Sequence, residues 1–594
     1  MLNKYGLQAV ERVTRLLSGF PVSRQLTMAE LAETYRGRFA TGWEIPQLFS
    51  DADIHLRLLI PTGFPFNPPR IAVYPAPKVL TWPHLEENGM LCLLPNEAPV
   101  TTEKVEELVR ALLVNAQCLV NDCLAGRKFE QFEEEFQSYW LRWHDNNAVL
   151  MVMCQPGGPS RWVSAWHGQY RTVIADEELS LVGWLKNAHG ENINGKPTIQ
   201  PVPLLWLPRP LRPSEYPNTV GKLLSLQIAT IEDRDILRQA LLSSNFRHKT
   251  ILLGFQSLNG PVFAGITISH EKNYPRHIKP VIKGFRTKDR VPLQVRLERY
   301  HAVPIKGVSA IRCDSSWIHG RDSNLQLTQL TGKRVVILGV GSVGSGLAEL
   351  LVKAGVGNLV LIDPDLFASE NTSRHTLGLK SLQRHKATEL AEVLGRRFPH
   401  LSITGYNKSW ERLYAECNNC FDSKDLIIST IGIWGAESQL NALAKGTPDF
   451  PPIVYGWTEP YAAAGHVVAI FGGKGCLRCI LDDSGRDPLP TTSWPNEGTL
   501  RATPSCGGDF QPYGAIELSH IQTLVADLAV DVLTARVQKI THHAWIGKKK
   551  LLEMNNGTWN TAWTTKYGDP MNGGRFVEAA FVTDPSCVIC GDIE

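Results

Sequence analysis

The chain has 594 residues, of which 43% are hydrophobic and 20% are charged, and its formal net charge is +3. These proportions are those of globular proteins and exclude a wholly disordered, collagen-like or coiled-coil chain. At roughly 100–200 residues per domain, we expect about three to five domains. So small a net charge gives no reason to expect nucleic acid or an anionic membrane as a partner.

The sequence also bears on the cellular compartment. Residues 1–17 carry charges within their apolar stretch, so they do not resemble a secretory signal. No apolar run reaches the roughly 18–20 residues that span a bilayer. We therefore expect a cytoplasmic protein. In that reducing compartment, the 12 cysteines are more often metal ligands or nucleophiles than disulfides.

Residues 1–147 are predicted to form the first domain. An amphipathic helix opens it, with five apolar residues on one expected face: Leu7, Val10, Val13, Leu16 and Leu17. A strand is predicted over residues 54–60, followed by a turn with three prolines over residues 64–69. Helices are predicted from about 103 to 124 and, with an aromatic stripe facing the core, over residues 130–146.

Residues 148–315 form the predicted middle domain, a mixed α/β scaffold or linker. Short strand signals alternate with turns, and we find no chemical motif there. Six prolines between Pro201 and Pro217 predict irregular structure in that stretch.

Residues 316–594 change to an α/β pattern. Apolar, β-branched runs at residues 335–338, 359–362 and 425–428 alternate with helical stretches. Such alternation predicts a parallel sheet with crossover helices, hence a Rossmann-like third domain.

A glycine-rich loop follows the first of these strands. Gly339, Gly341 and Gly344 form G-x-G-x-x-G between a strand and a helix, a pattern that lets the backbone approach phosphates. With Asp363 at the end of the next strand, this pattern alone would suggest a dinucleotide. The polar residues beyond it favour a nucleoside triphosphate instead, because Arg and Lys can neutralise several phosphate charges. They are Asp365, Asn371, Arg374 and Lys386.

This constellation resembles the adenylation domain of ubiquitin-activating-like enzymes, the ThiF-type family that includes bacterial sulfur-carrier adenylyltransferases. The resemblance implies ATP-dependent adenylation of a protein's C-terminal carboxylate, with Mg²⁺. By matching position, Asp363 would hold the ribose, and Asn371, Arg374 and Lys386 would hold the phosphates. The family's magnesium-binding aspartate has no counterpart, because Gly432 follows the third strand. Another acid would have to substitute.

Two C-x-x-C pairs predict a zinc site. Each pair supplies two corners of a tetrahedron, so together they can enclose one Zn²⁺. The ligands would be Cys476, Cys479, Cys587 and Cys590. The family often has such a site. A third pair, Cys417 and Cys420, is a rival partner, and its simpler interpretation is an exposed loop without metal.

Cys506 stands apart from these pairs. Glycines surround it, and a helix is predicted over residues 516–533 beyond it. A thiolate near a helix N-terminus has a lowered pKa and is the better nucleophile. In thioester-forming activating enzymes the nucleophile lies in such a segment. We therefore predict that Cys506 is catalytic, against the alternative of an ordinary small core residue.

Residues 1–147 resemble the α+β ubiquitin-conjugating enzymes. The proline-rich turn, the Pro83-His84 turn and Gly89-Met90-Leu91-Cys92-Leu93 follow that family's order. The resemblance implies that Cys92 is a second catalytic nucleophile. The asparagine that usually precedes the cysteine is missing, so His84, Asn88 or backbone N–H groups would stabilise the oxyanion. The alternative is an inactive relative with a buried cysteine.

The combination is similar, in order and length, to the conjugating/activating fusion proteins of bacterial CBASS antiphage systems. That resemblance implies adenylation of a partner's C-terminal carboxylate, thioesters on Cys506 and then Cys92, and an amide with a target amine. It also implies a cyclic-nucleotide synthase as the partner and a homodimer. Two other functions stay open: a sulfur-carrier adenylyltransferase of cofactor synthesis, and a non-catalytic scaffold.

Overall fold

A computed structural model of the chain describes a defined set of residues, to which all structural statements below refer. These are 2–19, 23–46, 49, 53–94, 103–144, 148–169, 171–189, 197–226, 230–242, 249–268, 295, 297–298, 301–320, 327–417, 419–495, 498–502 and 509–591. The chain forms two compact units. The first comprises Met1–Glu178 and Thr198–Arg312, and the second comprises Leu179–Pro197 and Cys313–Glu594. The predicted boundaries after residues 147 and 315 stay predictions.

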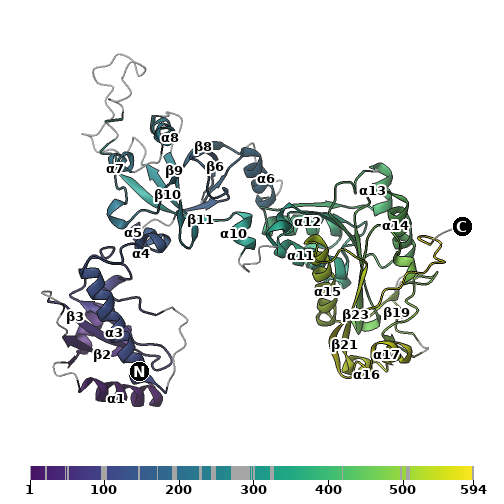
Figure 1. Cartoon of the computed structure of the whole chain (residues 1–594), viewed down its shortest axis with the longest axis horizontal. Helices are drawn as coiled ribbons and strands as arrows, with labels where there is room; N and C mark the ends of the chain where they lie inside the picture. Colours follow the sequence, from purple (N-terminus) through teal and green to yellow (C-terminus); the bar gives the residue numbers. More distant parts are fainter. Residues whose placement is uncertain are drawn as a thin grey trace. The chain divides into compact units, whose positions relative to one another are not determined.

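The first unit begins with a four-stranded antiparallel sheet in the order β1-β2-β3-β4, at the purple end of the chain in Figure 1. Its apolar residues form one core with two helices, α1 and α3. The bounds are α1 Lys4–Leu17, β1 Arg24–Gln25, α2 Met28–Tyr35, β2 Phe39–Pro46, β3 His55–Pro61, β4 Arg70–Tyr74, the 3₁₀ turn η1 Glu87–Gly89 and α3 Val105–Leu124. The helices and the strand predicted from sequence are therefore confirmed.

The predicted buried faces are partly wrong. On α1 the buried residues are Gly6, Ala9, Val13 and Leu17, whereas Leu7 is 56% exposed. The buried residues of α1 are spaced three or four apart, as expected for one face of a helix, and Leu7 does not lie on that face. The helical segment after α3 is broken at Glu135 into α4 Gln131–Glu134 and α5 Phe136–Trp143. Its aromatic stripe is buried as predicted, at Phe132, Phe136, Tyr139 and Trp140.

The middle of the chain, teal in Figure 1, contains a closed barrel in the order β10-β11-β5-β7-β6-β8-β9. Its strands are β5 Val149–Val152, β6 Arg161–His167, β7 Arg171–Ala175, β8 Ile199–Leu207, β9 Lys249–Ser257, β10 Gly260–Ile268 and β11 Ile305–Arg312. Two helices accompany it, α7 Val220–Leu224 and α8 Ile231–Leu242. The short strands that the sequence indicated for this region are therefore the strands of one closed barrel.

The prediction of irregular structure between Pro201 and Pro217 is wrong up to Leu207, because β8 runs through Pro201 and Pro203. It is confirmed from Pro208 to Pro217, where the chain has bends and one 3₁₀ turn, η3 Pro213–Glu215. Both prolines pair with β6, and pairing with β9 begins only at Leu204. Residues two apart direct their backbone nitrogens to the same side of a strand. Pro201 and Pro203 therefore lie in the part of β8 that is paired on one side only, where a proline nitrogen can face the unpaired side without loss of a sheet hydrogen bond.

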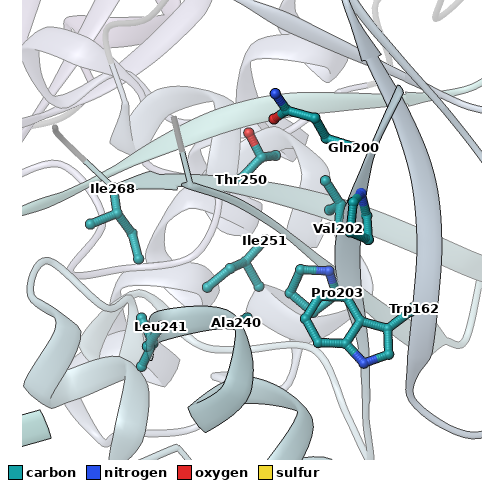
Figure 2. Close-up of a pocket in the computed structure, with 10 residues that line it drawn as sticks. Trp162, Gln200, Val202, Pro203, Ala240, Leu241, Thr250, Ile251 and Ile268 are labelled. Carbon is teal, nitrogen blue, oxygen red and sulfur yellow. The ribbon is translucent and has the colours of Figure 1, made fainter. Parts of the chain in front are cut away.

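A small cavity lies between α8 and the barrel strands. Figure 2 shows Ala240 and Leu241 of α8 opposite Val202 and Ile251 of the barrel. The space open to the centre of a water molecule is about 10 Å³, room for roughly one water. This cavity is therefore too small to be a substrate site.

The second unit is built on an eight-stranded sheet in the order β14-β13-β12-β15-β16-β17-β21-β23 (Figure 1). The strands β12, β13, β14, β15 and β16 are parallel, which confirms the predicted crossover pattern. The strands β17, β21 and β23 extend the sheet in antiparallel pairs. The bounds are β12 Arg334–Leu338, β13 Asn358–Ile362, β14 Ser402–Tyr406, β15 Leu426–Ser429, β16 Ile453–Thr458, β17 Ala464–Ile470, β21 Thr541–Lys548 and β23 Gly573–Ala579.

Helices cover both faces of this sheet. Val335 and Ile337 of β12 share a core with one group of helices, and their neighbours Val336 and Leu338 share a core with another. The first group is α11 Ser342–Ala354, α12 Lys386–Arg397 and α15 Ala515–Leu533, and the second is α13 Trp410–Glu416 and α14 Trp434–Gly446. Each central strand is therefore buried on both sides, as its continuous apolar sequence requires.

Smaller elements complete the second unit. They are α6 Glu178–His189, which lies almost wholly within it, α10 Ser315–His319, α16 Lys549–Met554, α17 Thr561–Tyr567 and the short strands β18 Thr492–Ser493, β19 Arg501–Ala502, β20 Asp509–Phe510 and β22 Thr558–Trp559. Among the helices described, none is both long enough and apolar enough to span a lipid bilayer.

Candidate functional site

The glycine loop joins the end of β12 to α11, whose N-cap is Gly341. Gly339 has a φ of 80°, a conformation that favours glycine. A Cβ on Gly344 would lie 2.0 Å from Gly339 O and 2.6 Å from Thr430 Oγ1. A Cβ on Gly341, in contrast, would meet nothing within 4 Å. Two glycines therefore permit close packing of the loop, and the third borders open space.

Asp363 follows β13 and is 5% exposed. Its Oδ2 accepts a hydrogen bond from Val340 N–H, and its Oδ1 accepts one from Asp365 N–H, both at 2.8 Å. Burial raises the pKa of this carboxyl, while these two N–H donors and the charge of Lys386 oppose the increase. Both oxygens of Asp363 thus already accept hydrogen bonds from the backbone around the loop. The prediction that Asp363 holds the ribose did not include this role.

The predicted phosphate ligands lie on the segment between β13 and α12. Lys386, the first residue of α12, is buried, and its Nζ lies 3.0 Å from Asp365 Oδ2. Asp365 has a side chain that is 64% exposed. Asn371 Oδ1 accepts a hydrogen bond from Ala368 N–H, which closes a local turn. The Asp365–Lys386 pair therefore offers an exposed carboxylate beside a buried ammonium.

Arg374 contacts a segment that the sequence motif did not include. Its Cζ lies 4.7 Å from the centre of the Tyr513 ring, and its Nη1 donates to Gln511 O at 3.4 Å. The Tyr513 hydroxyl in turn lies 2.6 Å from Ser342 Oγ in the first turn of α11. The structure thus brings Arg374 to the start of α11 through Tyr513, about 140 residues later in the chain. No short motif could have revealed that contact.

The edge beyond β15 offers no replacement for the missing magnesium ligand. Gly432 has a φ of 70° and carries no side chain. The nearest following acid, Glu437, is buried, and its Oε1 accepts hydrogen bonds from Ser429 Oγ at 2.7 Å and Gly432 N–H at 3.4 Å. Burial raises the pKa of Glu437. Glu437 is therefore not available as an ion ligand, and we assign no Mg²⁺ ligand at this edge of the sheet.

The two C-x-x-C pairs come together in the second unit. One sulfur atom from each of Cys476, Cys479, Cys587 and Cys590 lies within 4.8 Å of the others. Cys476 Sγ is 3.6 Å from Cys587 Sγ, and Cys479 Sγ is 3.4 Å from Cys590 Sγ. A tetrahedron with Zn–S bonds of 2.3 Å has edges of about 3.8 Å, so the four sulfurs fit Zn²⁺.

The rival pair lies elsewhere. Cys417 is exposed, and its Sγ donates to Asn419 Oδ1 at 2.9 Å. Among the residues that the structure describes, the only cluster with metal-binding spacing is the one formed by the other four cysteines. Cys417 and Cys420 are therefore not partners of the two C-x-x-C pairs in that cluster.

The predicted nucleophile of this unit, Cys506, lies outside the described residues. The helix expected beyond it is confirmed as α15, which begins at Ala515. Its role in catalysis stays a prediction.

Cys92 lies in the first unit, directly after the turn that contains η1. Its backbone N–H donates to His84 O at 2.9 Å, and Leu91 N–H donates to Ile71 O at 2.8 Å. Gly89 has a φ of 75°, and a Cβ there would lie 2.1 Å from Val73 O. The turn thus depends on glycine, and it leaves Cys92 exposed. The alternative of a buried cysteine is wrong.

Charged residues surround this thiol. Burial raises the pKa of Cys92, and Glu86 raises it further, while Arg70 acts in the opposite direction. Arg70 Nη2 lies 2.7 Å from Glu86 Oε2. The unloaded Cys92 is therefore mainly a thiol at neutral pH. Because its own N–H is bonded to His84 O, that group is not free to stabilise an oxyanion.

Helix α5 and the residue before it contact the same turn. His84 N–H donates to the Tyr139 hydroxyl at 2.9 Å, which lies 3.1 Å from Glu135 Oε2. Arg142 Nη1 donates to Leu85 O at 3.0 Å. The sequence predicted this helix only as a core-facing stripe, so its polar contacts with the Cys92 turn were missed.

A groove of about 310 Å³ runs beside the Cys92 turn. Leu91 and Leu93, the neighbours of Cys92, line it together with Pro68, Pro69 and Leu112. Asn67 and Arg70 also line it, so an extended segment linked to Cys92 would meet both apolar and polar side chains there.

With this geometry described, comparison with known proteins defines the class. Residues 319–566 match the ThiF family, and residues 23–149 match prokaryotic E2 family B. The chain therefore joins a ThiF adenylation domain to a ubiquitin-conjugating-like domain, and both resemblances predicted from its motifs are confirmed.

The chain is also homologous to proteins named ATP-dependent ubiquitin transferase-like protein Cap2. It is 24% identical to that of Pseudomonas aeruginosa over 494 residues, which cover 78% of this chain and 83% of the relative. It is 24% identical to that of Escherichia coli strain TW11681 over 300 residues, 48% of this chain and 46% of the relative.

Two further matches concern part of the chain. Molybdopterin-synthase adenylyltransferase of Escherichia coli K12 is 30% identical over 161 residues, 27% of this chain and 63% of that protein. The crystal structure of Escherichia coli MccB with AMPCPP and MccA covers 46% of this chain and 71% of its own, at 15% identity and a TM-score of 0.32.

Proposed function

We propose that the chain is an ATP-dependent protein ligase that activates the C-terminal carboxylate of a partner protein and joins it to an amine. The observation that carries the proposal is the presence, on one chain, of an exposed Cys92 in an E2-like domain and of a ThiF domain with a glycine-rich loop. Tethering makes successive transfers local, because it raises the effective concentration of the second thiol.

The first step is adenylation. A carboxylate oxygen of the partner attacks the α-phosphorus of ATP, so that an acyl-adenylate forms and pyrophosphate leaves. Arg374 and Lys386 supply positive charge for the phosphates, and both lie on the segment that borders the glycine loop. The exposed carboxylate of Asp365 is better placed for a ribose hydroxyl than Asp363, whose two oxygens hold backbone N–H groups. Mg²⁺ would accompany ATP as the counter-ion of its phosphates.

The remaining steps transfer the acyl group. The Cys506 thiolate attacks the acyl carbon and releases AMP, and Cys92 then takes the acyl group by thioester exchange. An amine attacks the Cys92 thioester, the C–N bond forms as the C–S bond breaks, and the amine proton ends on the thiolate. The raised pKa of Cys92 favours that last protonation.

The partner would be a protein with a free C-terminus. The name of the Cap2 relatives, ubiquitin transferase-like, supports a protein substrate. We extend this to a cyclic-nucleotide synthase primed in CBASS antiphage defence, acted on in the cytoplasm by a homodimer. The groove beside Cys92, lined by leucines and prolines and also by Asn67 and Arg70, supports a partner with an extended C-terminal segment.

One alternative has a specific observation in its favour. The identity of 30% to molybdopterin-synthase adenylyltransferase supports a role in sulfur-carrier chemistry. That chemistry makes no use of Cys92 or of the E2-like domain. The missing aspartate at Gly432 would instead favour a scaffold without catalysis.

One experiment separates the three functions. The purified chain is incubated with [³²P]pyrophosphate, ATP and candidate partner proteins from the same genome neighbourhood. Exchange of label into ATP, together with a thiol-sensitive adduct at Cys92 by mass spectrometry, is the expected result. Exchange without a Cys92 adduct would favour the sulfur-carrier function, and no exchange with any candidate would favour the scaffold.

A further inference from the structure

The peptide groups of the glycine loop are held by side chains from three other segments. Thr430 Oγ1 donates to Gly339 O at 2.7 Å, and Val340 N–H donates to Asp363 Oδ2 at 2.8 Å. His375 Nε2 lies 2.7 Å from Val340 O. Three consecutive polar groups of this backbone are therefore fixed from outside the loop.

The hydrogen bonds of His375 define its tautomer. Leu377 N–H donates to His375 Nδ1 at 3.0 Å, so Nδ1 carries a lone pair. The proton of the neutral ring is then on Nε2, which donates it to Val340 O. Burial lowers the pKa of His375 to about 4, so the ring keeps this neutral form at physiological pH.

The next polar group along the backbone is the Gly341 N–H. In a trans peptide the C=O and the following N–H point in opposite directions. The bond from His375 to Val340 O therefore directs Gly341 N–H away from His375. This N–H has no hydrogen-bond partner within the described part of the chain, and the position of Gly341 borders open space.

We propose that His375 is a positioning residue for phosphate binding, which acts through the Val340 carbonyl to aim the Gly341 N–H at a nucleotide phosphate. The inference rests on the proposed function, since it assigns the open side of the loop to ATP. Hydrogen-bond strength depends steeply on the N–H···O angle, so a peptide free to rotate would bind phosphate less well.

The segment that carries His375 is itself anchored to α11. Thr376 Oγ1 donates to Ser345 O at 3.0 Å, and Thr376 N–H donates to Ser345 Oγ at 3.3 Å. The His375 ring also meets the edge of Phe367, with ring centres 5.2 Å apart. A substitution that keeps a ring should therefore preserve packing while it removes the donor.

The test uses three variants of the full chain. His375→Phe keeps a ring without nitrogen atoms, His375→Asn keeps an acceptor near Nδ1 but no donor to Val340 O, and His375→Gln places an amide N–H near the position of Nε2. Binding of MgATP, tripolyphosphate and adenosine is measured by competition with a fluorescent ATP analogue, and thermal unfolding shows whether each variant is folded.

We expect His375→Phe and His375→Asn to weaken MgATP and tripolyphosphate by about tenfold, the equivalent of one hydrogen bond, with adenosine unchanged. His375→Gln should restore most of the affinity. An equal loss for adenosine would mean a merely structural role and would overturn the inference, as would unchanged affinity for tripolyphosphate in His375→Phe. If the wild-type chain bound no MgATP, the proposed function would fail first and the inference with it.

Discussion

Lys386 Nζ and Asp365 Oδ2 form an ion pair at 3.0 Å in which the lysine side chain is 11% exposed and the aspartate 64% exposed. The ammonium group is thus held at the N-terminus of α12 by a carboxylate that solvent can reach. A phosphate that enters the site would compete with Asp365 for Lys386. Asp365 keeps the buried charge paired until then, which avoids the cost of an isolated ammonium group.

We predict that Lys386→Ala and Arg374→Ala lose pyrophosphate exchange. Removal of one charge-assisted contact to a phosphate costs about 1.5–3 kcal/mol, which corresponds to roughly a 10- to 150-fold loss. Lys380→Ala is the matched control, because Lys380 is an exposed lysine on the same segment. Exchange at the wild-type rate in Lys386→Ala or Arg374→Ala would rule out this assignment.

We predict one zinc ion per chain, bound by Cys476, Cys479, Cys587 and Cys590. Serine at any one position removes a thiolate ligand, so metal content and the thermal unfolding midpoint should fall together. Metal content is measured by inductively coupled plasma mass spectrometry. Cys417→Ser should change neither quantity. Native protein that is fully folded and free of zinc would disprove the site.

We predict that Cys506 and Cys92 are loaded in a fixed order. Cys506→Ala should keep pyrophosphate exchange and lose every covalent adduct, because Cys92 takes its acyl group only from Cys506. Cys92→Ala should keep a reducible adduct at Cys506 and lose the amide product. Cys118→Ser, at an exposed thiol on α3, is the control and should behave as wild type.

Gel mobility with and without reductant, followed by peptide mapping, identifies each adduct. A thiol-sensitive adduct on Cys92 in the Cys506→Ala protein would contradict the order. Mixing Cys506→Ala with Cys92→Ala tests transfer between chains, and recovered amide would mean that exchange occurs in trans.

We predict that Glu86→Gln lowers the pKa of Cys92. Burial raises this pKa most, and Glu86 is the next contribution, so loss of its negative charge stabilises the thiolate. Arg70 would also lose its carboxylate partner, while Glu135 would continue to raise the pKa of Cys92. The alkylation rate of Cys92 by iodoacetamide, followed by peptide mass spectrometry across pH 7–10.5, should therefore rise at lower pH than in wild type.

Glu87→Gln removes the same charge one residue further along, at an exposed position, and should leave the pH profile of Cys92 alkylation unchanged. Identical profiles for Glu86→Gln and wild type would show that Glu86 does not act on the thiol.

The parts of the fold that sequence predicted are those with local signals. Continuous apolar runs predicted β12, β13 and β15, because parallel strands covered on both faces need them. The barrel was not predictable, since its closure depends on pairs such as Ser309 with Val149, about 160 residues apart. Strand β8 was also missed, because Pro201 and Pro203 indicate irregular structure unless the pairing of the strand is known.

The candidate site divides in the same way. The motif placed Asp363, Arg374 and Lys386 near the glycine loop, and all three lie on the segments that border it. It could not show that both oxygens of Asp363 serve the backbone, because that depends on the conformation of residues 340 and 365. Tyr513 was missed for a different reason, since only tertiary folding brings it to Arg374.

Tyr139 and Trp140 are adjacent in α5, yet they are bonded to different parts of the first unit. The Tyr139 hydroxyl accepts the His84 N–H beside Cys92, and Trp140 Nε1 donates to Val308 O of barrel strand β11 at 3.1 Å. One turn of α5 therefore links the turn that carries Cys92 to the barrel. If Cys92 moves toward the acyl donor of the proposed mechanism, either the barrel moves with it or one of these two hydrogen bonds breaks. The rate of acyl delivery would then depend on how readily this link between the Cys92 turn and the barrel breaks.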